Sequence, residues 1–222
     1  MVERGGLWLL ATPGKQELWT CEHDGDLLSK KKLESKKYLG IHREGWKFFI
    51  TFILISGFSF FISKILFFIF ILLSCFTLWF FRDPERFVES QDNQFLSAAD
   101  GKICFIGEEY PPKETDINEK MKKVSIFMNV FNVHINRSPI NGFIEKITYK
   151  NGKFFNASLD KASEHNERNS IIIKNNDEKI IVVQIAGLIA RRILSFISEG
   201  HKIDKGDRIG LIRFGSRVDI YF

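Results

Sequence analysis

The long apolar stretch from Phe48 to Phe81 constrains the fold of this chain more than any other feature. Its two arms, Phe48–Ile62 and Ile65–Phe81, are separated by Ser63 and Lys64. Each arm is somewhat shorter than the roughly 20 residues that a bilayer-spanning helix needs. The whole stretch is nevertheless too long and too apolar for an ordinary buried helix. The sequence therefore predicts a segment that attaches the protein to a membrane.

Two arrangements of this stretch remain open: a tight helical hairpin with Lys64 at its turn, or a single long or kinked insertion. Basic residues flank both ends, with a lysine-rich segment before the stretch and Arg82 and Arg86 after it. The positive-inside rule places both flanks in the cytoplasm, which favours the hairpin. The apolar length and the residues that precede it argue against a cleaved signal peptide. We expect a location at the cell membrane, with the following domain on the cytoplasmic side.

The chain after the apolar stretch is typical of a β-rich domain. Runs rich in Ile, Val, Phe and Tyr are separated by Pro-Pro, Asn-Gly and Asn-Asn-Asp turn signals. The segment 187–200 instead has apolar residues at helical spacing and ends at Gly200, which predicts a short helix. The residues after it indicate strands joined by glycine turns. The predicted strands before it cover residues 102–109, 123–130, 143–150, 170–174 and 179–185.

These patterns divide the chain into three parts: a tail of unassigned role (1–37), the membrane-anchoring segment (38–84) and a catalytic domain (85–222). The fold class expected for the domain is mainly β (α+β), a compact β-sandwich or barrel-like structure with one short helix. The net charge of +5 is concentrated beside the apolar stretch, which indicates anionic lipid and not nucleic acid as the partner. Three widely spaced cysteines show neither metal-ligand spacing nor a disulfide framework.

The Gly215-Ser216 pair near the end of the chain is compatible with self-cleavage. A serine after glycine can attack the carbonyl before it, because glycine adds no side-chain obstruction. The amide then becomes an ester, β-elimination breaks the chain, and loss of ammonia leaves a pyruvoyl group at the new N-terminus. Such a ketone can capture an amine. A lone Gly-Ser pair is more often a turn, so other residues have to support the chemistry.

A serine hydroxyl needs a positioned base, and His134 is the leading candidate because histidine titrates near neutral pH. Asp100 is the natural partner to orient it and to stabilise its protonated form. The alternatives are a structural histidine and, since Gly101 follows, an aspartate in a turn. The chain order Asp, His, Ser proves nothing by itself, since triads occur in several orders.

From about Ile41 to Phe222 the chain resembles the short, bacterial and archaeal type of phosphatidylserine decarboxylase proenzyme. The matching segments, in order, are IHREGW, FFRDPER, SAADGK, FMNVFNVHINRSPING, DKASEHNERN, VQIAGLIARRI and KGDRIGLIRFGSRVDIY. The resemblance implies cleavage between Gly215 and Ser216, with Ser216 becoming a covalent pyruvoyl cofactor. It also implies an Asp-His-Ser triad formed by Asp100, His134 and Ser216. No metal is implied.

In this family the pyruvoyl group forms a Schiff base with phosphatidylserine, and decarboxylation yields phosphatidylethanolamine. The implied partners are phosphatidylserine in the inner membrane and the two cleavage products, which remain together as a heterodimer. Arginine suits a lipid phosphate, so Arg137, Arg191 and Arg192 are candidate substrate-binding residues, although each can equally be a surface ion-pairing residue.

The chain departs from the family pattern in two places. Phe131 stands where longer relatives carry a second histidine, and the chain ends at Phe222, which leaves a small subunit of seven residues (216–222). Two alternative functions therefore stay open. One is a membrane-anchored β-domain that never matures, and the other is a decarboxylase for a related aminophospholipid.

Overall fold

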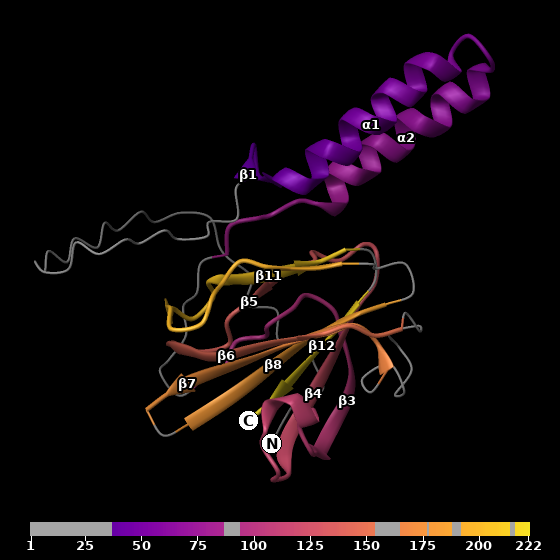
Figure 1. Ribbon diagram of the computed structural model, residues 1–222. Helices are drawn as coiled ribbons and strands as arrows, with labels where there is room; N and C mark the ends of the chain where they lie inside the picture. The colour runs from indigo at the N-terminus through magenta and orange to yellow at the C-terminus, as the bar shows by residue number, and fades with distance from the viewer. Residues whose placement is uncertain (1–36, 87–93, 154–164, 177, 188–191, 214–215) are drawn as a thin grey trace, which may run out of the picture.

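The computed structural model describes residues 37–86, 94–153, 165–176, 178–187, 192–213 and 216–222. Within these residues a pair of long helices stands on a domain of antiparallel β-sheets (Figure 1). Residues 1–36 of the predicted tail, Arg191 and Gly215 lie outside the described residues.

The apolar stretch forms helices α1 (Arg43–Ser59) and α2 (Lys64–Phe80), which lie side by side as a hairpin (Figure 1). Their small polar side chains point inward, because Ser56, Ser74 and Thr77 are buried while many Phe, Ile and Leu side chains are exposed. The hydroxyl of Ser56 donates to the carbonyl of Phe67, and that of Ser74 donates to the carbonyl of Phe49. Neither helix, nor any other in the described part of the chain, is long and apolar enough to cross a membrane.

Twelve strands and one short 3-10 helix complete the described structure. They are β1 (Lys37–Tyr38), β2 (Ile41–His42), β3 (Lys102–Glu109), η1 (Lys113–Thr115), β4 (Met121–Met128), β5 (Ile135–Arg137), β6 (Gly142–Lys150), β7 (Arg168–Asn175), β8 (Glu178–Ala186), β9 (Ile193–Ser195), β10 (Lys202–Ile203), β11 (Arg208–Ile212) and β12 (Ser216–Tyr221).

The domain is built from two layers of sheet. The large sheet has the order β10-β6-β7-β8-β12-β4-β3, and the small sheet has the order β5-β11-β9. Every strand pair is antiparallel. The main core contains side chains of both sheets, among them Ile126, Val182 and Val218 from the large sheet and Ile212 from the small one. The two sheets therefore pack face to face, and β12 is an interior strand of the larger one, between β8 and β4.

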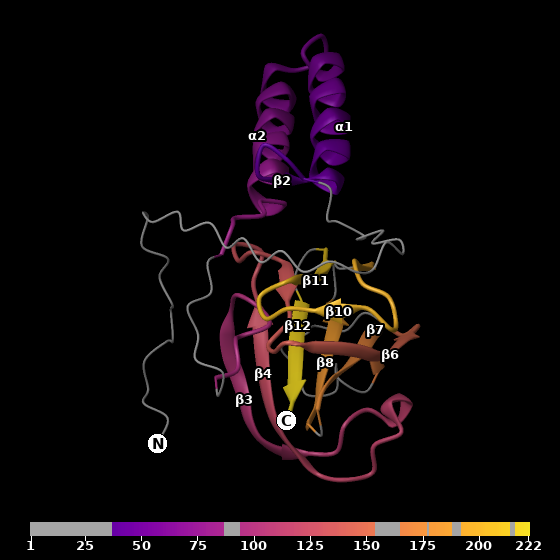
Figure 2. The same cartoon turned by 90° about the vertical axis from the view of Figure 1, so that its left-hand side faces the viewer.

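The base of the helical hairpin packs on the outer face of the small sheet. Phe80 and Phe81 at the end of α2 form one buried cluster with Val133, Ile135 and Leu211. Figures 1 and 2 show the hairpin standing over β11, on the side away from the large sheet. The layers therefore follow in the order hairpin, small sheet, large sheet.

The mainly β fold and the five predicted strands between residues 102 and 185 are confirmed. The predicted helix at 187–200 is wrong in its described part, because residues 193–195 form strand β9. Ile193 is buried in the core between the sheets, whereas Leu194 packs against the cluster under the hairpin. The segment is therefore a strand that pairs with β11 and is packed on both faces. A strand with apolar residues on both faces lacks the simple period of two, which is why the spacing of its apolar residues resembled that of a helix.

Gly45 and Gly57 in α1 offer a matched test of the hairpin packing. A Cβ atom at Gly45 would lie 2.6 Å from Cβ of Phe81, whereas one at Gly57 would meet nothing within 4 Å. Gly45→Ala should lower the free energy of unfolding by about 1–3 kcal/mol through overpacking. Gly57→Ala should leave it unchanged or raise it by up to about 1 kcal/mol through helix propensity. Thermal unfolding in detergent micelles, followed by circular dichroism, measures both, and equal effects would contradict this packing.

Candidate active site

Ser216 is the first residue of β12, the interior strand of the large sheet that lies between β8 and β4. It is wholly buried, and it pairs with Met128 of β4 on one side and with Ala186 of β8 on the other. Its hydroxyl lies 4.0 Å from the sulfur of Met128. Side chains alternate along a strand, so Ser216 shares the face of Val218, which belongs to the core between the sheets. The hydroxyl therefore points into the layer that the small sheet covers.

His134 lies at the start of the small sheet, directly before β5. A turn fixed by two asparagines leads to it: Asn132 accepts a hydrogen bond from the backbone of Asn129, and Asn129 accepts one from the backbone of Phe131. The carbonyl of His134 accepts a hydrogen bond from the backbone of Ile212, at 3.3 Å. Ile212 is the last residue of β11. The predicted base is thus held beside the strand that leads into the Gly215-Ser216 junction.

The surroundings of the His134 ring fix its tautomer and its charge. Nδ1 lies 3.0 Å from the carbonyl oxygen of Asn132. A carbonyl can only accept, so Nδ1 carries the proton and, in the neutral ring, Nε2 carries the lone pair. The ring is fully buried against Phe80, with the ring centroids 4.3 Å apart. Burial, reinforced by the charge of Arg82 and opposed by the bond to Asn132, lowers the pKa of His134 to about 4. The imidazole is therefore neutral at neutral pH, with its single N–H proton on Nδ1.

Asp100 lies at the same end of the large sheet as Ser216, just before β3. The strand register pairs Lys102 with Phe127 and Met128 with Ser216, which places Asp100 two strands from Ser216, about 10 Å away at the usual strand spacing. A Cβ atom on the following Gly101 would lie 2.3 Å from the carbonyl oxygen of Phe127, so only glycine allows this approach.

The carboxylate of Asp100 forms an ion pair with Arg86, whose Nη2 lies 2.6 Å from Oδ2. The orienting contact at Nδ1 of His134 comes from the Asn132 carbonyl, a residue that the sequence patterns did not single out. The structure therefore brings Asp100, His134 and Ser216 to one end of the domain. The role of Asp100 in orienting His134 stays a prediction.

The predicted substrate-binding arginines differ in their surroundings. The guanidinium of Arg137 donates to the carbonyls of Gly206 and Pro84 and lies 3.6 Å from the buried carboxylate of Asp83. These contacts join the small sheet to the chain that leaves the hairpin. Arg192 is exposed, and its carbonyl accepts a hydrogen bond from the backbone of Arg213.

The helical hairpin contacts both sides of the candidate site. Arg213, which follows β11, forms an ion pair with Glu44 of α1, and its guanidinium lies 5.6 Å from the ring centroid of Phe48. On the other side, Phe80 of α2 packs on the His134 ring. The end of the hairpin nearest the domain therefore contacts both His134, the predicted general base, and the chain just before the predicted cleavage site.

Arg82 and Trp79 are site residues that sequence reasoning did not identify. Arg82 directly follows α2, and its guanidinium lies 4.0 Å from the ring centroid of Trp79. Its Nη2 donates to the carbonyl of Phe131, at 2.8 Å, in the turn before His134. The FFRDPER segment at the end of the apolar stretch was the available signal, but it was interpreted as a basic flank and as part of the family resemblance, with no role at the site for Arg82.

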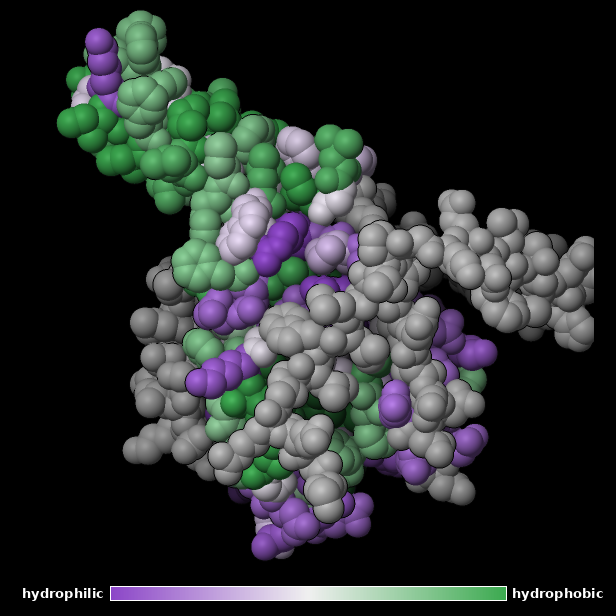
Figure 3. Space-filling model, turned by 180° about the vertical axis from the view of Figure 1, so that it is seen from behind, coloured by the Kyte–Doolittle hydropathy of each residue, from purple (hydrophilic) through white to green (hydrophobic). Residues whose placement is uncertain are grey.

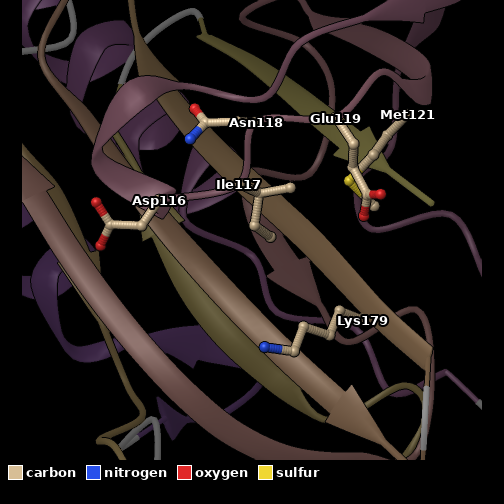
Figure 4. A pocket seen from close by; sticks show the side chains of 6 residues that line it. All are labelled: Asp116, Ile117, Asn118, Glu119, Met121 and Lys179. Carbon is tan, nitrogen blue, oxygen red and sulfur yellow. The ribbon is translucent and has the colours of Figure 1, made fainter.

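A surface pocket of about 550 Å³ lies elsewhere on the domain. Figure 4 shows its lining side chains, which come from the loop before β4 and the start of β8: Asp116, Ile117, Asn118, Glu119, Met121 and Lys179. Met121 begins β4, while Met128 at the other end of that strand pairs with Ser216. The pocket is therefore at the opposite end of the sheet from the candidate site.

Comparison with known proteins agrees with the geometry. The phosphatidylserine decarboxylase family model matches residues 73–222. Two relatives, each called phosphatidylserine decarboxylase proenzyme, come from Xanthobacter autotrophicus and Azorhizobium caulinodans. Each is 50% identical over 187 residues, which is 84% of this chain and 80% of the relative. The match includes Asp100, His134 and the Gly215-Ser216 junction within the family model. The chain therefore belongs to the phosphatidylserine decarboxylase family of enzymes.

Proposed function

We propose that this protein is a phosphatidylserine decarboxylase that cleaves itself between Gly215 and Ser216 and converts Ser216 into a covalent pyruvoyl group. The observation that carries the proposal is the position of Ser216. It is a fully buried serine at the start of an interior strand, on the face that the small sheet covers. The name proenzyme, which both relatives bear, also supports processing of the chain.

The proposed cleavage uses only groups of the chain and one water molecule. The hydroxyl of Ser216 attacks the carbonyl carbon of Gly215, and the peptide bond becomes an ester as the nitrogen of Ser216 is released as an amine. Removal of the α-proton of Ser216 then breaks the bond between Cβ and the ester oxygen. Gly215 leaves as a carboxylate, and residue 216 becomes an enamine. Tautomerisation to the imine and hydrolysis by water release ammonia.

His134 is the proposed general base for these reaction steps. The proton on Nδ1, held by Asn132, leaves the lone pair of the neutral ring on Nε2, where it can accept the hydroxyl proton of serine. Burial keeps the ring neutral before the reaction. Asp100 is proposed as the group whose negative charge stabilises the ring once it is protonated, from the same end of the sheet.

The site fits a pyruvoyl group derived from Ser216, because that residue is held by backbone pairing on both sides. All six residues of β12 pair with β4 and with β8. Phe222 also exchanges two backbone hydrogen bonds of 3.0 Å with Lys122. The segment 216–222 would thus stay in the sheet after cleavage, as the small subunit of a heterodimer. The group's ketone supplies an electron sink for loss of the substrate carboxylate.

A second network supports this retention. The buried guanidinium of Arg217 donates to Asp219, at 2.6 Å, and to the hydroxyl of Ser125 in β4, at 2.9 Å. The ammonium of Lys123, also in β4, lies 3.3 Å from Asp219. Separating β12 from β4 would break the contacts of Arg217 with Ser125 and of Asp219 with Lys123, so these contacts favour the paired strands.

The helical hairpin is the proposed membrane attachment. The basic residues that flank both of its ends support a domain on the cytoplasmic side of the inner membrane. Figure 3 shows hydrophobic surface over most of the hairpin, in contrast to the hydrophilic far end of the domain. Exposed apolar side chains on the hairpin include Leu54, Phe58, Phe61, Ile65, Phe68 and Leu72. Helices with inward serines and outward apolar residues are typical of a lipid environment. The substrate, phosphatidylserine, would then reach the site at the base of the hairpin.

Intact-mass spectrometry tests the self-cleavage. The wild-type protein should give a large fragment that ends at Gly215 and a short peptide with a pyruvoyl N-terminus. Ser216→Ala should remain full length, because no hydroxyl is left to form the ester. His134→Ala should slow processing by about 10²- to 10⁴-fold, the usual contribution of a general base. Ser195→Ala, at an exposed serine of the small sheet, is the control and should process normally. Active protein with an uncleaved backbone would refute the proposal.

The pH dependence of processing should reflect the low pKa of His134. The base form is lost only as the pH falls through about 4, so the cleavage rate should stay level from neutral pH down to about pH 5 and drop below it. An ordinary histidine would lose activity near its reference pKa of about 6.5. Precursor made by cell-free synthesis and moved into buffers of different pH gives the rate by mass spectrometry. Circular dichroism on the same samples checks that the fold persists. A midpoint near 6.5 would contradict the assignment.

Flotation with phospholipid vesicles tests the role of the hairpin. Replacement of Phe58, Phe61, Ile65 and Leu72 by glutamine should sharply reduce the fraction of protein that floats, because about 25 cal/mol per Å² of buried apolar area is lost. The control replaces Ile103, Ile106 and Phe143, which are exposed apolar residues of the β-domain, by glutamine, and it should float like the wild type. Undiminished flotation of the hairpin variant would contradict membrane attachment through these helices.

A further inference from the structure

Arg82 differs from most other arginines near the candidate site in having no acidic partner among the described residues. Arg43 and Arg192 share this property, but it is Arg82 whose charge acts on the pKa of His134. The ion-paired arginines, each with a carboxylate within 4.0 Å, are Arg86, Arg137, Arg168, Arg208, Arg213 and Arg217. Arg82 thus offers a positive charge that forms no ion pair among the described residues, next to the predicted base.

Neutral contacts hold the guanidinium of Arg82 in place. Its Nη1 donates to the carbonyl of Trp79, at 2.9 Å, and its Nη2 donates to the carbonyl of Phe131, at 2.8 Å. The guanidinium lies over the Trp79 ring, at 4.0 Å from the centroid. A guanidinium has five N–H donors in a rigid fork, so further donors remain for an anion. Because the group is already oriented, little conformational entropy is lost when an anion binds.

The position of Arg82 lies between the proposed membrane segment and the proposed chemistry. It directly follows α2, and its neighbours Trp79 and Phe131 are 43% and 62% exposed. Their rings meet edge to face, 5.8 Å apart. Tryptophan is enriched at the depth of lipid headgroups. On the inner side, the charge of Asp100 raises the pKa of Arg82, and Arg82 in turn lowers that of His134, although burial is the larger effect in both cases.

We propose that Arg82 binds the phosphate of the phospholipid substrate, and that Trp79 and Phe131 hold its guanidinium in position. The inference rests on the proposed function, since it assigns the headgroup contact of that same site. In phosphatidylserine the phosphodiester separates the buried serine headgroup from the glycerol and the acyl chains. A phosphate-binding group is therefore needed at the boundary between the hairpin base and the site, which is where Arg82 lies. Arginine binds phosphate through paired, charge-assisted hydrogen bonds.

The test uses Arg82→Gln and a monomeric substrate, dihexanoyl phosphatidylserine below its micelle concentration, so that attraction to a membrane plays no part. Self-cleavage should be complete by mass spectrometry and kcat close to the wild-type value. KM should rise by about tenfold or more, the usual effect of losing a hydrogen bond to a charged group. Arg82→Lys, which keeps the charge but not the fork, should give a smaller rise. Lys102→Gln removes an exposed charge at the same end of the sheet and should leave KM unchanged.

An unchanged KM in Arg82→Gln would overturn the proposal, as would an equal rise in Lys102→Gln, which would indicate unspecific charge attraction. Arg82 also joins two backbone carbonyls, so thermal unfolding is measured on each sample, and rates are expressed per cleaved molecule. If Arg82→Gln does not mature, Arg82→Lys decides: a raised KM supports the phosphate contact, and an unchanged KM refutes it. Failure of the proposed function itself is distinguishable, because the wild-type protein would then neither cleave nor decarboxylate.

Discussion

The backbone pairing of β12 is the interaction on which the rest of the structure depends. This strand joins β8 to β4 and so makes one sheet of two halves. It also carries Ser216 at its first position and orients the hydroxyl toward the small sheet. Hydrogen bonds along both edges and the buried contacts of Arg217 with Ser125 and of Asp219 with Lys123 in β4 mean that the strand does not rely on its covalent connection to β11. A chain that cuts itself at this point can therefore keep its fold.

The second organising interaction is the packing of the hairpin base on the small sheet. Phe80 contributes both to the buried cluster beneath the hairpin and to the dry surroundings of the His134 ring. Glu44, at the other foot of the hairpin, neutralises Arg213 just before the predicted cleavage site. Phe80 therefore both fixes the hairpin to the domain and helps to bury the candidate base.

The sequence was sufficient for the strands, because runs of β-branched residues bounded by turn signals are local features. It also singled out Ser216 and His134, whose residue types suit the chemistry. It failed at β9, where burial on both faces imitates helical spacing. It could not show that a backbone carbonyl, that of Asn132, orients His134, or that Arg86 pairs with Asp100. Those contacts depend on how distant segments pack, and no local pattern records them.

The order of the strands has a consequence for the timing of synthesis. β12 follows all the other described strands in the chain, yet it lies inside the large sheet, between β8 and β4. Until it leaves the ribosome, the facing edges of β8 and β4 have no partner, and open edges invite pairing with other chains. The nucleophile itself arrives with the strand that closes this gap. Under the proposed self-cleavage, a nascent chain would thereby be protected from cutting itself too early, since the reactive arrangement would arise only once β12 has joined the sheet.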